Sequence, residues 1–165
     1  MAATQASPAS PPRLLLRHTL ATLAYRGGKA VRNAPPGFES FRAAEGSRSA
    51  GEILAHIGDL FDWAVSMIQG KQAWHSSTPL PWDEETARFF TALNAFDQSL
   101  DQTAELPVSL EVLFQGPIAD ALTHIGQISL LRRLASAPVK AENYAQAEIT
   151  AGRVGPDQVP PRREF

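Results

Sequence analysis

The chain has 165 residues, 44% of them hydrophobic, and a formal net charge of -2. This is the size of one domain, with enough apolar residues to form a hydrophobic core. Without a basic excess the chain is a poor partner for nucleic acid or an anionic membrane surface, and we expect neither. It contains no cysteine, which excludes disulfides, thiolate metal ligands and thiol nucleophiles, so any metal must be bound through nitrogen and oxygen.

The N-terminal segment is small and polar. Apart from the initiating Met, residues 1–12 are Ala, Ser, Pro, Thr and Gln, a composition that cannot bury apolar surface, so we expect disorder there. The segment lacks the charged and apolar regions of a signal peptide, and no stretch reaches the roughly 18 to 20 apolar residues of a membrane span. We therefore expect a cytoplasmic protein that does not bind membranes.

The first helix is predicted over residues 13–31, where apolar residues recur at helical spacing. Gly27 and Gly28 should weaken its last turns, because glycine is a poor helix former. The following residues, 33–51, are rich in Pro, Gly and Ser and predict a long connection.

The second helix is predicted from a capping box. Ser49 and Glu52 have the required spacing, and the apolar stripe that follows extends to about Gly70. His56 lies on or beside this stripe.

Two further helices are predicted in the second half of the chain. Acidic residues at 83–85 favour a helix start, and this helix should end before Pro107. Pro117 suits a first helical turn, so the last helix should run from there to about Ala135 and be closed by Pro138.

No alternating apolar pattern of useful length predicts a strand. The chain is therefore expected to be all-α, with residues 13–135 forming a four-helix bundle. Residues 136–165 are rich in Gly, Pro and charge, and predict an irregular C-terminal strap held on the bundle by Tyr144 and Ile149.

A candidate metal site comes from two of these helices. Asp120 and His124 are four residues apart, about one helical turn, so their side chains should project from one helix face. With His56 from the second helix, one carboxylate and two imidazoles can supply three ligands and leave the remaining positions open.

The alternative is that Asp120 caps a helix at the surface while His56 and His124 are hydrogen-bonded core residues. Gln127 argues against this, because it shares a face expected to point inward with Asp120 and His124. Burying these polar groups without partners would cost roughly 1 to 3 kcal/mol each. A metal or a hydrated pocket would satisfy them together, with Gln127 as a pocket group.

Other conspicuous residues are interpreted as structural. Trp63, Trp74 and Trp82 are expected to be core and loop anchors, since no basic stripe accompanies them as in a nucleic-acid platform. His18 and His75 lack acidic or histidine neighbours at helical spacing and are expected to be structural or solvent-facing.

From about Leu14 onward the chain resembles the DinB-like family of bacterial four-helix bundles, many of which are metalloenzymes. The segments that carry the resemblance are LAHIGDLFDWA, PLPWDEETARFFTALNAFD, GPIADALTHIGQISLLRRLASAPV and ENYAQAEITAGRVG. The family pattern is one histidine on the second helix and H-x-x-x-H-x-G-Q on the last. His56 and His124 match it, whereas Asp120 stands at the position of the middle histidine.

The resemblance implies a divalent metal bound by His56, Asp120 and His124, with Zn, Ni, Fe and Mn as the candidates, and a possible homodimer. It also implies a metal-dependent protein acting on a small molecule, either a hydrolase or a thiol-dependent transferase. Because an Asp replaces the usual middle histidine, the alternative is a non-catalytic binding or dimerisation module with a degenerate metal site.

Overall fold

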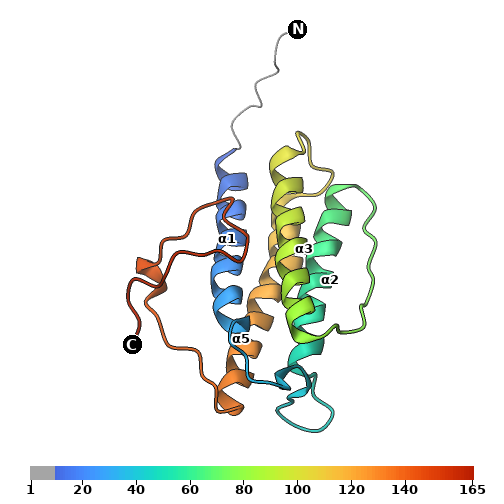
Figure 1. Ribbon diagram of the computed structural model, residues 1–165. Coiled ribbons are helices and arrows are strands. Elements are labelled where there is room, and N and C mark those ends of the chain that lie inside the picture. Colours follow the sequence, from blue (N-terminus) through green and yellow to red (C-terminus); the bar gives the residue numbers. More distant parts are fainter. Residues whose placement is uncertain (1–9) are drawn as a thin grey trace.

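The computed structural model describes residues 10–165, and this part of the chain is helical without β-strands (Figure 1). The predicted all-α four-helix bundle is confirmed. The four long helices are α1 (Pro11–Val31), α2 (Ala50–Ile68), α3 (Trp82–Gln102) and α5 (Ala119–Leu134). The shorter elements are α4 (Leu110–Leu113), a π-helical turn (Phe114–Ile118) and two 3-10 turns (Phe38–Ser40 and Tyr144–Gln146).

The helices form a square in which α1 and α2 lie on one diagonal, each in contact with both α3 and α5. Figure 1 shows that α2 and α3 run in the same direction, because residues 69–81 return along the outside of α2 before α3 begins. We call this segment the crossover. Its path brings loop side chains against the middle of α2, where His56 is located.

The start of α1 differs from the sequence expectation. Residues 1–9 of the segment predicted to be disordered lie outside the described residues, but Pro11 and Pro12 form the first turn of the helix. Proline is favoured there because its missing N–H would have no partner inside the helix and its fixed φ suits helical backbone.

The glycine pair in α1 has a packing role. The helix continues through Gly27 and Gly28 to Val31, and a Cβ on Gly27 would lie 2.5 Å from the ring of Phe89 on α3. Glycine therefore permits the close approach of α3 to α1, an effect that helix propensity alone does not reveal.

The capping box of α2 is present as predicted. Ser49 Oγ accepts a hydrogen bond from the backbone N–H of Glu52 (3.2 Å), and the Glu52 carboxylate accepts one from the N–H of Ser49 (2.7 Å). This cap fixes the residue at which α2 begins.

The last helix begins earlier than the sequence predicted. Its helical path starts at Leu110, where Ser109 is the N-cap, so Pro117 lies inside the helical path and not in its first turn. Proline lacks an N–H and collides with the carbonyl four residues back, and the wider π-helical turn relieves both problems. This turn places Gly116 beside Trp63 of α2.

The core lies between the four long helices and is filled by aliphatic and aromatic side chains. The largest fully buried ones come from all four long helices, from α4 and from the π-helical turn: Leu20, Leu23, Leu54, Ile57, Phe61, Phe89, Leu93, Phe96, Leu100, Leu113, Ile118 and Ile128. None of the described helices is both long and apolar enough to cross a membrane.

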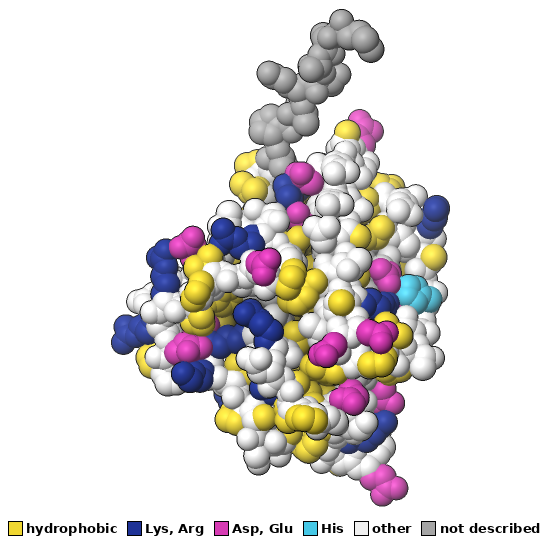
Figure 2. All heavy atoms as spheres, in the orientation of Figure 1, with side chains coloured by type: hydrophobic (Ala, Val, Ile, Leu, Met, Phe, Trp, Pro, Cys, Tyr) yellow, Lys and Arg dark blue, Asp and Glu magenta, His cyan; other side chains and the backbone are white. Residues whose placement is uncertain are grey.

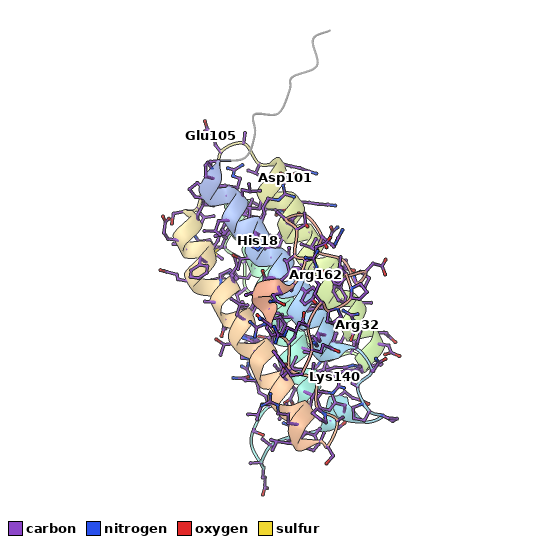
Figure 3. The ribbon with its side chains drawn as sticks, turned by 90° about the vertical axis from the view of Figure 1, so that its left-hand side faces the viewer. His18, Arg32, Asp101, Glu105, Lys140 and Arg162 are labelled. Carbon is purple, nitrogen blue, oxygen red and sulfur yellow. The ribbon has the colours of Figure 1, made fainter. Side chains whose placement is uncertain are left out.

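Residues 136–165 lie along α1 and α5 without a long helix (Figures 1 and 3). Glu142 is buried and accepts hydrogen bonds from Tyr25 Oη (2.6 Å) and Lys29 Nζ (2.7 Å). Tyr144 packs edge-on against Tyr25, and Val154 is buried in the core. Figure 2 shows basic and acidic side chains interspersed over this strap, so its outer surface has no single sign of charge.

Candidate metal centre

The structure brings His56, Asp120 and His124 together, the first from the middle of α2 and the other two from α5. His56 Nε2 lies 3.5 Å from one carboxylate oxygen of Asp120, and His124 Nε2 lies 3.3 Å from the other. One ligand atom from each residue lies within 4.8 Å of the other two. The i, i+4 spacing on α5 and the packing of α2 against α5 together create the cluster.

These distances, each to a different oxygen of Asp120, are longer than short charge-assisted hydrogen bonds and close to the spacing of neighbouring ligand atoms around a cation. Two ligand atoms that each lie about 2.1 Å from a tetrahedral metal are roughly 3.4 Å apart. A charge-assisted N–H to carboxylate hydrogen bond is shorter, about 2.7 to 2.9 Å. The three side chains are therefore spaced so that an ion could contact all of them after small rotations.

Gln127 orients the ring of His124. Its Oε1 lies 2.8 Å from His124 Nδ1, a contact in which the Nδ1–H tautomer of the ring donates to the amide oxygen. In the neutral ring the Nε2 lone pair then faces the Asp120 carboxylate, and two acceptors face each other unless a cation lies between them. A hydrogen bond from the other ring nitrogen is the usual companion of a metal-binding histidine.

Removing the Gln127 side-chain amide should weaken metal binding. We expect Gln127→Leu to lower the Zn²⁺ affinity about 10- to 100-fold, because His124 loses the partner that fixes its tautomer and ring orientation. Competition with a chromophoric chelator measures this affinity. Gln98→Leu, on the exposed side of α3, is the matched control and should bind as the wild type does. Equal affinities in all three proteins would show that Gln127 has no such role.

His56 is partly buried and is flanked by an aromatic residue of the crossover. Burial, the nearby His124 and the charge of Arg48 lower the pKa of His56, and the neighbouring Asp120 only partly offsets them. The ring is therefore neutral near pH 7, the form in which imidazole binds metals. Trp74 covers it from outside, with ring centroids 5.6 Å apart.

A cavity of about 370 Å³ opens beside the cluster. It is lined by Leu60 and Trp63 of α2, Gln115 and Gly116 of the π-helical turn, and Ala119, Asp120 and Thr123 of α5. Asp120 is half-buried and belongs both to the cluster and to this wall, so the cluster is open to solvent on the side of the cavity.

The expectation for Gln127 was wrong. Gln127 was expected to point inward, but it is exposed and reaches back to His124 along the surface of α5. Trp63 packs against the core, as expected, and also lines the cavity, while Trp74 contacts His56. The placement of Trp74 depends on the crossover, whose path no sequence pattern indicated.

The remaining histidines lie outside the cluster. His18 is exposed on the side of α1 that faces the viewer in Figure 3, with α5 and the strap beside it. His75 lies on the crossover, half exposed, with Nε2 3.1 Å from Asp59.

A second group of ligand-type residues, Asp59, Asp62 and His75, also lies close together. Here Arg88 Nη2 already contacts both carboxylates, at 2.6 Å from Asp59 and 2.9 Å from Asp62. Ser77 donates its N–H (2.9 Å) and its hydroxyl (2.6 Å) to Asp59. Because the guanidinium already pairs with both carboxylates, we interpret this group as an ion-pair network that holds the crossover against α2 and α3.

Comparison with known proteins adds no relative: no family model, no curated protein and no solved structure matches this chain. The resemblance to the DinB-like family therefore stays a prediction from the sequence. What the structure itself provides is a helical bundle with a partly buried His/Asp group at metal-binding distances.

Proposed function

We propose that this protein binds one divalent metal ion through His56, Asp120 and His124, and that it is a DinB-like metal-dependent protein acting on a small molecule. The observation that carries the proposal is the convergence of three ligand atoms from α2 and α5. Gln127 supports it by presenting His124 Nε2 to the other two ligands.

The types of ligand limit which metal ions the site can bind. Two imidazoles and one carboxylate suit Zn, Ni, Fe or Mn, and three protein ligands leave coordination positions for water or substrate, as in catalytic sites. Such a metal would supply Lewis acidity to a bound water or thiol, which is the chemistry of a hydrolase or a thiol-dependent transferase. The protein supplies the neutral His56, the oriented His124 and the cavity at Asp120.

The rival function is a non-catalytic module whose metal site has degenerated. It would be favoured by His56, Asp120 and His124 bonded tightly to one another in a closed environment. The separations of 3.3 and 3.5 Å and the adjoining cavity favour the metal centre instead.

Metal titration tests the proposal directly. Protein purified without a nickel column and stripped with a chelator should bind Zn²⁺, Ni²⁺, Fe²⁺ or Mn²⁺ at one ion per chain, measured by calorimetry and elemental analysis. Failure to bind any of the four ions above the level of a histidine-free helical protein would contradict it.

Restoring the histidine of the family pattern tests whether residue 120 is a ligand position. Asp120→His should raise Zn²⁺ and Ni²⁺ affinity by about tenfold or more, because imidazole is a softer and stronger donor to these ions than carboxylate. Asp101→His, an exposed position on α3, is the control for adding a histidine. No gain over that control would mean that residue 120 is not a ligand position.

A further inference from the structure

We propose that the cavity beside Asp120 binds the apolar, preferably aromatic, body of a ligand that carries no anionic group on that body and whose polar head reaches the metal. The inference rests on the proposed metal function and adds to it the chemical class of the ligand. It follows from the lining of the cavity, from the way Trp63 is held, and from the absence of a side chain at Gly116.

The lining selects against anionic ligands. Leu60, Trp63 and Ala119 provide apolar surface, and Gln115 and Thr123 are neutral, so Asp120 is the one ionised side chain among the lining residues. Among the residues that the structure describes, no Lys or Arg lines the cavity to neutralise a phosphate or a second carboxylate. A volume of about 370 Å³ suits a small molecule with a single ring.

The indole of Trp63 forms one wall of the cavity, and Trp74 of the crossover packs against it. Trp74 packs edge-on against Trp63, with ring centroids 5.8 Å apart and planes at 87°, and it also contacts His56. Ser77 and Asp59 fasten the crossover that carries Trp74. The indole of Trp63 is thus a fixed surface for an aromatic or aliphatic group, and such contacts contribute to binding beyond simple burial.

Gly116 leaves the part of the cavity next to the Trp63 ring open, because glycine has no side chain. A Cβ at this position would lie 3.5 Å from the Trp63 ring, so alanine would touch the ring and a longer side chain would occupy the cavity. Gly116 does not adopt a left-handed φ, so the backbone does not require glycine here. The cavity and the cluster meet at Asp120, which lets one ligand occupy both.

Two hydroxamic acids with the same metal-binding head test the inference. We expect Zn²⁺-loaded protein to bind benzohydroxamic acid at least about tenfold more tightly than acetohydroxamic acid, after correction for their affinities to free Zn²⁺. Calorimetry measures both affinities, and quenching of tryptophan fluorescence reports contact with the indole wall.

Gly116→Leu should abolish this preference while leaving Zn²⁺ affinity within about threefold of wild type. Gly126→Leu, on an exposed face of α5 with open space around it, is the matched control and should keep the preference. Melting curves verify that both variants fold. Equal corrected affinities of the two acids for metal-loaded wild type would overturn the inference and leave the metal function standing. Failure to bind any of Zn²⁺, Ni²⁺, Fe²⁺ and Mn²⁺ would overturn both.

Discussion

Arg88→Met should lower the free energy of unfolding by about 3 kcal/mol, the largest stability effect we expect from a single surface-accessible position. Arg88 contacts Asp59, Asp62 and the buried Glu85, and it also donates to the backbone carbonyl of Ala55. Removing one partner of a buried ion pair costs roughly 3 to 5 kcal/mol, since the other charges stay buried without compensation. We expect the lower end of this energy range because Asp62 is partly exposed.

Chemical denaturation of wild type and variant at neutral pH measures this difference. Arg42→Met is the control, because it breaks an exposed ion pair with Glu52 and should change stability little. A loss for Arg88→Met no larger than that of the control would show that the network does not stabilise the fold.

The ion pairs of Arg88 also determine how the stability of the fold changes at acid pH. Burial raises the pKa of Asp59, but the hydrogen bonds from Ser77 and the charge of Arg88 outweigh it and hold this pKa below its ordinary value of 3.8. Asp59 therefore stabilises the native state fully above that pH, and the contribution is lost as the pH falls through the lowered pKa. The stability difference between wild type and Arg88→Met should shrink between about pH 5 and about pH 2.

His124→Ala should weaken binding of the divalent metal by more than about 100-fold, because even the loss of a residue that supports a ligand costs 10- to 100-fold. His124 contributes Nε2 to the cluster and is the ligand whose orientation is fixed by a second side chain, Gln127. The substitution leaves only His56 and Asp120, too few ligands to compete with water for most divalent ions.

The matched control is His18→Ala, which removes an exposed histidine of α1. It should keep one metal per chain in the same titration, and circular dichroism should show helical spectra for both variants. Equal metal content and affinity in the two alanine variants would defeat the assignment of residues 56, 120 and 124 as ligands.

Short-range sequence patterns were sufficient to predict most of the helices. The Ser49 capping box and the apolar stripes are short-range patterns whose energetics do not depend on distant residues. They failed at Pro117, because this proline lies inside a π-helical turn that accommodates the proline ring while the segment packs against α2. They predicted only that Gly27 weakens the helix, whereas Gly27 allows Phe89 of α3 to pack closely against α1.

The sequence by itself determined the helical class and the candidate ligands, because periodicity and the four-residue spacing of Asp120 and His124 are properties of one helix. Only the tertiary structure decided that His56 meets them, that Gln127 reaches back from the surface, and that a cavity adjoins Asp120. It also decided the path of the crossover, which carries Trp74 to His56. Such contacts join residues far apart in the chain, and they form only once the helices have packed in one particular order and direction.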